Sequence, residues 1–101
     1  MKAFYHNKTI LVTGGSQGIG RALIDELISL GAQVATCGRN ADQLNLLQSA
    51  YSNEQLLCVQ ADVSQHDQAR HFVETSLSHF GKIDALINNA GISMQIGRAH
   101  V

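Results

Sequence analysis

The sequence predicts an α/β fold built on a parallel sheet, and three observations lead to this prediction. Four short apolar segments alternate along the chain with three longer segments in which apolar residues recur at near-helical spacing. The short segments are apolar throughout rather than alternating, which is typical of strands buried on both faces. A glycine-rich turn joins the first strand to the first helix. The alternation of strand and helix predicts parallel strands joined by right-handed crossovers.

Length and composition limit the class of protein. With 101 residues, of which 45% are hydrophobic and 15% charged, the chain is expected to form one globular domain at most. The net charge of −1 and the lack of a basic run argue against nucleic-acid binding.

No apolar run approaches the roughly 20 residues of a membrane span, and residues 1–8 are too few for a signal peptide. We therefore expect a soluble cytoplasmic protein. Cys37 and Cys58 fall in different strands and are expected to be reduced and buried.

The apolar segments and the stretches between them predict the elements. We expect strands at residues 9–13, 33–37, 56–60 and 84–88. We expect helices at residues 18–30, from 40 to about 51, and from 64 to 81. The apolar positions expected to define the inner faces are Ile19, Leu23, Leu27 and Leu30 in the first helix, and Ala69, Phe72, Val73, Leu77 and Phe80 in the third.

Helix ends carry their own signals. Asn40 with Gln43 three residues later predicts a capping box at the start of the second helix. Ser64 with Asp67 predicts a similar cap on the third. Glycines that can take a left-handed conformation are expected to end the first and third helices, at Gly31 and Gly81.

The run from Thr13 to Gly20 reads T-G-x-x-x-G-x-G and lies between the first strand and the first helix. A backbone free of side chains that leads into a helix N-terminus is suited to an anion, because unpaired N–H groups and the helix dipole both point at it. The spacing is not the common dinucleotide fingerprint G-x-G-x-x-G. Gly15 to Gly20 has the glycine spacing of a nucleoside-triphosphate loop, but Arg21 and Ala22 stand where that loop needs lysine and a hydroxyl. A turn that only tightens the strand–helix corner is the remaining alternative.

Two further landmarks come later in the chain, in order. Asp62-Val63 comes after the third strand, and Asn88-Asn89-Ala90-Gly91 ends the fourth. Together with the glycine-rich turn they resemble the N-terminal part of the short-chain dehydrogenase/reductase family, over residues 8–93. The resemblance implies a Rossmann-type doubly wound parallel sheet, truncated after the fourth strand. Residues 1–95 would then be the N-terminal part of an NAD(P)-binding domain.

The resemblance also implies a role for each matching residue. The residues around the phosphates and ribose would be Gly14, Ser16, Gln17, Gly18, Ile19 and Gly20. Gly18 and Gly20 would permit close approach and helix–strand packing. Asp62 and Val63 would contact the adenine, although an acid at that place also suits a turn. Asn89 would steady the central strands, and Ala90 with Gly91 would let the ribose pass closely.

The choice of cofactor rests on the end of the second strand. An NAD site usually has an acid there, which holds the ribose 2′-hydroxyl. This chain has Arg39 instead, and no acid before Asp42. A guanidinium pairs well with a 2′-phosphate, so we expect NADP(H) to be preferred over NAD(H), with Arg21 as a second positive charge nearby. The alternative is that Arg39 is a solvated surface residue.

No catalytic or metal-binding residue is expected within the chain. His66, His71 and His79 lack the i, i+4 spacing of helical zinc ligands. The resemblance implies a catalytic Y-x-x-x-K pair and a serine beyond residue 101, and neither Tyr5 nor Tyr51 has the required lysine.

The implied activity is an NADP(H)-dependent interconversion of a carbonyl and an alcohol by hydride transfer, with a 3-oxoacyl thioester, a sugar or a general alcohol as substrate. A non-catalytic dinucleotide sensor on the same fold and a phosphotransferase are the alternatives. The intact protein is expected to be a homo-oligomer.

The last six residues, 96–101, do not resemble the segment that members of the family have after the N-N-A-G motif. They match the peptide that the stem of a common sequencing adapter would encode. We expect them to be a non-native read-through tail.

Overall fold

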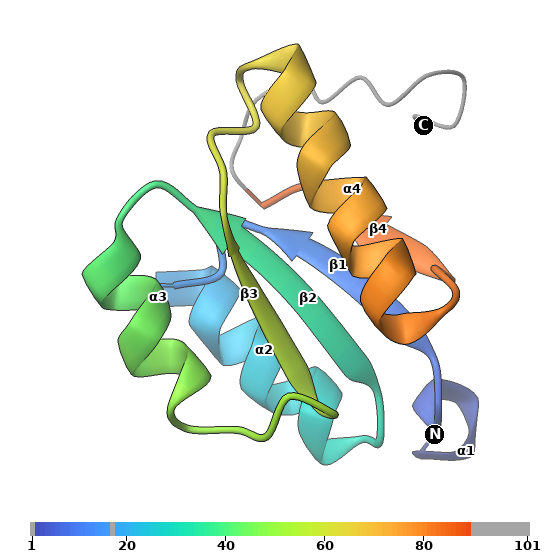
Figure 1. Ribbon diagram of the computed structural model, residues 1–101. Helices are drawn as coiled ribbons and strands as arrows, with labels where there is room; N and C mark the ends of the chain where they lie inside the picture. Colours follow the sequence, from blue (N-terminus) through green and yellow to red (C-terminus); the bar gives the residue numbers. More distant parts are fainter. Residues whose placement is uncertain (1, 17, 90–101) are drawn as a thin grey trace.

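Within residues 2–16 and 18–89, which the computed structural model describes, one parallel sheet carries helices on both faces (Figure 1). The strand order is β3-β2-β1-β4. The strands are β1 (Thr9–Thr13), β2 (Gln33–Gly38), β3 (Leu56–Gln60) and β4 (Ala85–Ile87). The helices are α1 (Lys2–Tyr5), α2 (Gly18–Ser29), α3 (Ala41–Gln48) and α4 (His66–Phe80). This confirms the predicted α/β fold, and α1 is the one element of this set that the sequence pattern did not predict.

The register of the sheet brings the carboxyl ends of the three longer strands together. Thr13 of β1 pairs with Cys37 of β2, and Cys37 in turn pairs with Val59 of β3. The order reverses at β1, because the chain passes from β3 back across the sheet to β4. A reversal of this kind leaves a crevice outside the carboxyl ends of the strands.

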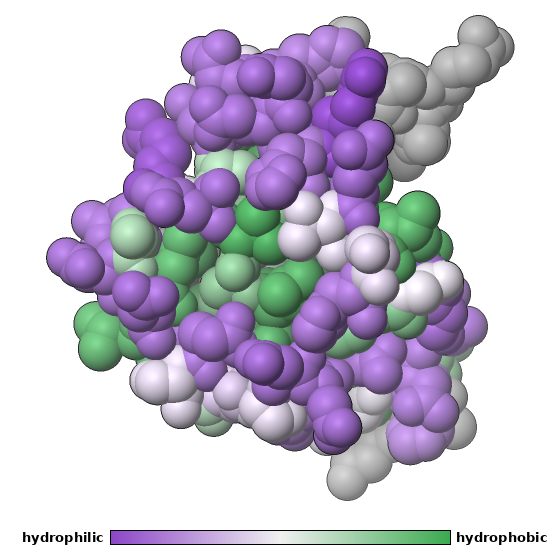
Figure 2. Space-filling model, viewed as in Figure 1, coloured by the Kyte–Doolittle hydropathy of each residue, from purple (hydrophilic) through white to green (hydrophobic). Residues whose placement is uncertain are grey.

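Two apolar clusters hold the layers together. In the first, α2 and α3 pack on one face of the sheet, with Ile24, Leu27, Ile28 and Leu47 against Ile10, Val12, Val34 and Leu56. In the second, α4 packs on the other face, with Ala69 and Phe72 against Leu11, Ala35, Cys37 and Val59. Figure 1 shows α4 crossing in front of the sheet. In Figure 2 apolar surface gathers over the sheet beside this helix, between two polar margins.

The rotation of α2 about its axis differs from the prediction. Ile24, Leu27 and Ile28 are buried, whereas Ile19 is 79% exposed. The buried positions follow Gly20 at spacings of four, seven and eight residues, which is one helical face. Of the predicted inner positions, Leu27 is buried and Leu23 packs against the first cluster, but the prediction for Ile19 was wrong. Apolar spacing alone leaves the rotation of the helix about its axis open.

The structure likewise corrects α4. Leu77, predicted on the inner face, is 47% exposed, and its neighbour Ser76 is buried instead. The Ser76 hydroxyl donates to the carbonyl oxygen of Phe72 at 2.7 Å, so burial leaves no unpaired donor. The predicted Ser64–Asp67 cap is also wrong, because the N-cap is Gln65 and its side chain makes no capping bond.

Other helix ends agree with the prediction. Asn40 caps α3, and its Oδ1 accepts a hydrogen bond from the N–H of Gln43 at 3.0 Å. Gly31 and Gly81 both follow helices and have φ of 94° and 82°. These are left-handed values that only glycine adopts at little cost. α3 ends at Gln48, three residues before the expected limit.

Candidate dinucleotide site

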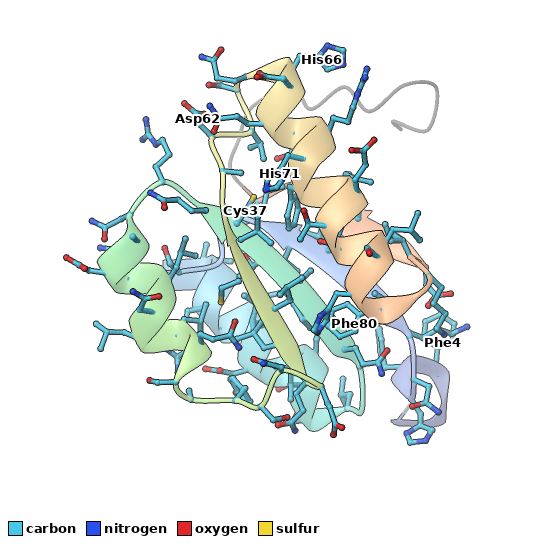
Figure 3. All side chains as sticks on the ribbon, viewed as in Figure 1. Phe4, Cys37, Asp62, His66, His71 and Phe80 are labelled. Atoms are coloured by element: carbon cyan, nitrogen blue, oxygen red, sulfur yellow. The ribbon has the colours of Figure 1, made fainter. Side chains whose placement is uncertain are left out.

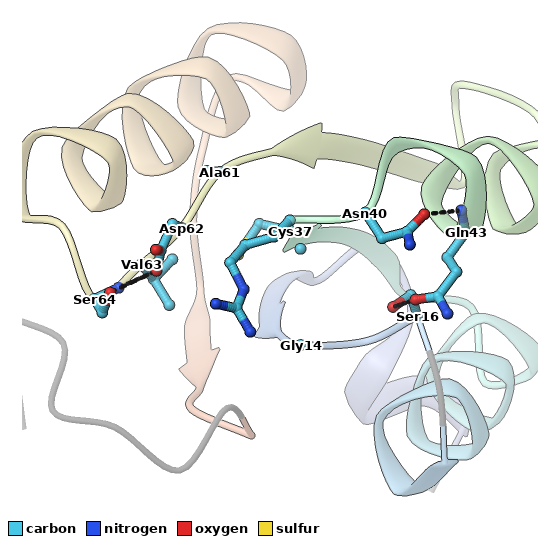
Figure 4. A pocket seen from close by; sticks show the side chains of 11 residues that line it. Gly14, Ser16, Cys37, Asn40, Gln43, Ala61, Asp62, Val63 and Ser64 are labelled. Atoms are coloured by element: carbon cyan, nitrogen blue, oxygen red, sulfur yellow. Dashed lines mark hydrogen bonds between the residues drawn. The ribbon is translucent and has the colours of Figure 1, made fainter.

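A groove of about 680 Å³ opens at the carboxyl ends of β1, β2 and β3 (Figure 4). Its size falls in the range usual for small-molecule and cofactor sites. The residues that line it come from the turn after β1, the end of β2, the start of α3 and the segment after β3. They are Gly14, Ser16, Cys37, Gly38, Arg39, Asn40, Gln43, Ala61, Asp62, Val63 and Ser64.

Two backbone N–H groups of the turn after β1 anchor it to β2. The N–H of Gly14 donates to the carbonyl oxygen of Cys37 at 3.1 Å, and Gly14 has a φ of 66°. The N–H of Gly15 donates to the buried hydroxyl of Thr36 at 3.1 Å, and that hydroxyl donates to the carbonyl oxygen of Val12 at 2.6 Å. Sequence reasoning missed Thr36, since nothing in a buried strand marks one threonine as the support of a loop.

Gly20 lets α2 start directly against this turn. A Cβ at Gly20 would lie 2.5 Å from the carbonyl oxygen of Gly14 and 2.7 Å from Nδ2 of Asn89. The Asn89 amide donates to the same Gly14 oxygen at 3.2 Å, so it ties the end of β4 to the turn after β1. This is a link between central strands of the kind expected of Asn89. Gly20 is therefore needed for space.

Gly18 and Ile19 behave differently from Gly20. A Cβ at Gly18 would meet nothing within 4 Å, so helix–strand packing needs a glycine at Gly20 and not at Gly18, whereas the space beside the Gly18 backbone is open. Its φ of 58° is the reason for glycine there. Ile19 projects its side chain outward at the start of α2. The start of α2 thus presents backbone with little side-chain cover.

One wall of the groove joins the turn to α3. The Ser16 hydroxyl donates to Oε1 of Gln43 at 3.4 Å, a long bond, drawn as a dashed line in Figure 4. In a complete capping box the Gln43 side chain would turn back to Asn40, but here it reaches across to the turn. Gln43 and Asn40 were predicted as capping residues only, and the structure also makes them groove residues.

The opposite wall is the segment after β3, with Asp62, Val63 and Ser64 (Figure 4). Oδ1 of Asp62 accepts hydrogen bonds from the hydroxyl and the N–H of Ser64, at 2.6 Å and 3.0 Å. These bonds, with a smaller contribution from the positive charge of Arg39, hold the pKa of Asp62 below its ordinary value. Val63 is buried in the cluster beneath α4 while it borders the groove.

Arg39 is exposed at the end of β2 and lines the groove. Its carbonyl oxygen accepts a hydrogen bond from Nε2 of Gln60 at 3.1 Å, which fixes the backbone there. Arg21 does not join it, because its Nε pairs with both carboxylate oxygens of Asp25 at 3.2 Å. The second positive charge expected from Arg21 is therefore already engaged on α2.

Both cysteines lie in surroundings that favour the thiol over the thiolate. Burial raises the pKa of Cys37 to about 11 and that of Cys58 to about 11, so both remain thiols at neutral pH. Both are free, and Cys37 is buried as predicted, whereas Cys58 is only half-buried. Figure 3 shows Cys37 within the sheet and Asp62 beyond the end of β3.

Three predicted residues, Gln17, Ala90 and Gly91, lie outside the described residues. Within residues 2–16 and 18–89, no group of three or more potential ligands is arranged to hold a metal ion. In Figure 3, His66 and His71 stand at separate places along α4. None of the helices in the described part of the chain is both long and apolar enough to span a membrane.

Comparison with known proteins identifies the family. The model of the short chain dehydrogenase family matches residues 8–100. The chain belongs to the short-chain dehydrogenase/reductase family. The match agrees with the parallel sheet of order 3-2-1-4 and with the glycine-rich turn after its first strand.

Individual short-chain dehydrogenases/reductases resemble the chain over most of its length. A tropinone reductase homolog of Arabidopsis thaliana is 41% identical over 91 residues, which are 87% of this chain and 34% of that protein. The 15-hydroxyprostaglandin dehydrogenase [NAD(+)] of Bos taurus is 37% identical over 92 residues, which are 87% of this chain and 35% of that protein. The crystal structure of a 3-ketoacyl-(acyl-carrier-protein) reductase from Brucella melitensis complexed with NADH superposes with a TM-score of 0.77 at 29% identity. The superposition covers 81% of this chain and 34% of the reductase chain. The chain spans about a third of the length of the curated relatives that it matches.

The residues of the groove fit a dinucleotide of the kind this family uses. The space beside the Gly18 backbone is open, and α2 starts at this residue. The first N–H groups of a helix have no partner within the helix. Phosphate oxygens would be bound by these groups and by the Ser16 hydroxyl. Arg39 adds a positive charge and Asp62 an acceptor to the lining of the groove.

Proposed function

We propose that this chain is the dinucleotide-binding part of an NADP(H)-dependent oxidoreductase that interconverts a carbonyl and an alcohol. One observation carries the proposal: the groove joins a glycine turn at a helix start to an exposed arginine at the end of β2. Residues 1–95 would form this part, and residues 96–101 would be a non-native tail. The bound cofactor would supply or accept the hydride, and the residues of the groove would hold it.

The proposed contacts follow the course of the groove. Backbone groups of Gly14, Gly18 and Gly20, with Ser16 and Gln17, would bind the two phosphates and the adjoining ribose, and Ile19 would cover them. Asp62 would accept a hydrogen bond from the exocyclic amine of adenine, and Val63 would border the ring. Asn89 would steady the central strands beside the cofactor, and Ala90 with Gly91 would let the ribose pass closely.

The preference for NADP(H) depends on Arg39. A guanidinium forms charge-assisted, often bidentate, hydrogen bonds with a phosphate monoester. The first acid after β2, Asp42, lies inside the first turn of α3, so no carboxylate at the end of β2 would hold a 2′-hydroxyl. The bovine relative carries NAD(+) in its name and the Brucella structure holds NADH, so the choice rests on this chain's own residue.

The test is a titration of the complete protein that contains this chain with NADP⁺ and NAD⁺, by calorimetry. We expect NADP⁺ to bind at least about tenfold more tightly, the factor for one good charge-assisted contact. In Arg39→Ala the two affinities should become similar, because NADP⁺ binding alone weakens. Arg70→Ala removes an exposed arginine of α4 and should change neither affinity. Equal or tighter binding of NAD⁺ by the unaltered protein would refute the preference.

The catalytic step requires groups outside this chain. We expect a tyrosine and a lysine in Y-x-x-x-K spacing, and a serine, encoded downstream of residue 95 in the intact gene. A gene without this pair would instead encode a dinucleotide sensor. Sequencing of the intact gene from genomic DNA also tests residues 96–101, since a natural stop directly after those codons would contradict the read-through tail. The intact protein is further proposed to act in the cytoplasm as a homo-oligomer on a small carbonyl or alcohol.

A further inference from the structure

Asp62 is held at two points by residues that come after it in the chain. Its Oδ1 accepts the hydroxyl of Ser64 at 2.6 Å and the N–H of Ser64 at 3.0 Å. Its own N–H donates to Oε1 of Gln68, in the first turn of α4, at 2.7 Å. The bonds from Ser64 appear as dashed lines at the wall of the groove in Figure 4. One carboxylate oxygen and the backbone of Asp62 are therefore both tied down.

The second carboxylate oxygen of Asp62, Oδ2, differs from Oδ1 in its hydrogen bonding. Oδ2 of Asp62 makes no hydrogen bond with any residue that the structure describes, and Asp62 lines the groove. An ionised carboxylate only accepts hydrogen bonds, and each oxygen can take two. With Oδ1 used twice by Ser64, the acceptor left for a ligand is Oδ2.

If the Ser64 hydroxyl were removed, the less restrained Asp62 carboxylate would have the Arg39 guanidinium as an alternative partner. Arg39 also lines the groove, and its charge already acts on Asp62. Without the Ser64 hydroxyl, Oδ1 of Asp62 would keep only the bond from the N–H of Ser64, at 3.0 Å. A side chain held by one bond instead of two samples more rotamers, and those that shorten the distance to a guanidinium are favoured by charge. The hydroxyl of Ser64 thus opposes a direct pairing of Asp62 with Arg39.

We propose that Ser64 is a positioning residue, which holds the Asp62 carboxylate so that Oδ2 accepts the exocyclic amine of adenine. Ser64 thereby sets the preference of the groove for adenine over bases that lack this amine. The inference rests on the proposed function, because it needs the adenine of the dinucleotide at this wall.

The test compares NADP⁺ with its hypoxanthine analogue, in which a carbonyl oxygen replaces the amine. Dissociation constants are measured on the complete protein by calorimetry. The unaltered protein should prefer NADP⁺ by about tenfold or more, since a hydrogen bond to a carboxylate is replaced by two facing acceptors. In Ser64→Ala the preference should fall below about threefold. Ser64→Thr retains a hydroxyl and should restore it, and the matched control Ser52→Ala, at a loop hydroxyl bonded to Gln55, should leave it unchanged.

The outcomes separate the two proposals. An unchanged preference in Ser64→Ala, or equal weakening of both ligands, overturns the role of Ser64 and leaves the proposed function standing. A preference near one in the unaltered protein also overturns the inference. Failure of the unaltered protein to bind either dinucleotide overturns the proposed function, and the inference with it. Should Ser64→Ala not fold, Ser64→Gly removes the same hydroxyl and must give the same reduced preference.

Discussion

At the residue scale, a small polar network on the surface joins two helical segments. The hydroxyl of Tyr51, just after α3, donates to Oδ1 of Asp25 on α2 at 2.6 Å. The same carboxylate receives Nε of Arg21 at 3.2 Å. The bond from Tyr51, with the hydrogen bond and charge of Arg21, holds the pKa of Asp25 below its ordinary value. The bond to Asp25 and burial raise the pKa of Tyr51.

Tyr51→Phe should therefore destabilise the fold by about 1 kcal/mol near neutral pH, through loss of one hydrogen bond to a charged group. The lowered pKa of Asp25 means that this stabilisation is complete above about pH 4 and is lost as pH falls through the folded-state pKa. The raised pKa of Tyr51 means that it is complete below about pH 10 and is lost as pH rises beyond. Chemical denaturation across pH measures the difference between the two proteins.

The matched control is Tyr5→Phe. The hydroxyl of Tyr5 makes no hydrogen bond within residues 2–16 and 18–89, so its removal should change the unfolding free energy by less than about 0.5 kcal/mol. A Tyr51→Phe difference that stays constant from pH 3 to pH 11 would contradict the assignment.

At the element scale, α3 and α4 begin in opposite ways. Asn40 caps α3 with its side chain, while Gln65 precedes α4 with extended backbone and no side-chain bond. Ser64, the residue expected to cap α4, gives its hydroxyl to Asp62 instead. The start of α4 thus has no side-chain cap, and Ser64 instead stabilises the wall of the groove.

Asn40→Ala should cost about 1 kcal/mol of stability, the usual loss for a side-chain N-cap. Gln65→Ala is the matched substitution at the other helix start and should cost less than about 0.5 kcal/mol. Urea unfolding of both variants, compared at equal slope, measures the difference. Equal losses in the two variants would mean that the bond from the Gln43 N–H to Asn40 contributes nothing.

At the scale of the whole molecule, the sheet ends in a short and sparsely covered strand. β4 has three residues and pairs with β1 alone among the described strands. Its residues are exposed or half-buried, in contrast to the fully buried β1. A cavity of about 420 Å³ lies beside it, with Ile10, Leu23 and Ile87 in its walls. Among the described residues no strand pairs with the outer edge of β4. Such an edge, with adjoining apolar surface, favours association with other chains.

The chain of residues 1–101 alone should consequently be marginally stable and prone to aggregate. We expect its thermal transition below about 50 °C, under the range common for mesophilic domains. Differential scanning calorimetry measures the transition, and light scattering at several concentrations measures aggregation. Cooperative, reversible unfolding above that temperature would show that the exposed edge of β4 is tolerated.

The sequence determined the features that depend on neighbours in the chain. Continuous apolar runs placed the strands, Gly31 and Gly81 ended their helices, and Asn40 capped α3, because each acts within a few residues through backbone conformation or a local hydrogen bond. Tertiary structure decided what joins residues far apart. It chose the buried face of α2 over the one led by Ile19, since a helical period leaves rotation about the axis open.

The candidate site also contains features that the sequence predicted and features that only the tertiary structure decided. Its turn and its Arg39 were predicted because glycine conformation and side-chain charge belong to single residues. The bond between Ser16 and Gln43 spans 27 positions, and that from Asn89 to Gly14 spans 75. These long-range bonds follow from how the strands and helices pack in space, and a pattern read along the chain does not contain that information. The bonds from Ser64 to Asp62 span only two positions and form the local turn that an acid at that place also suited.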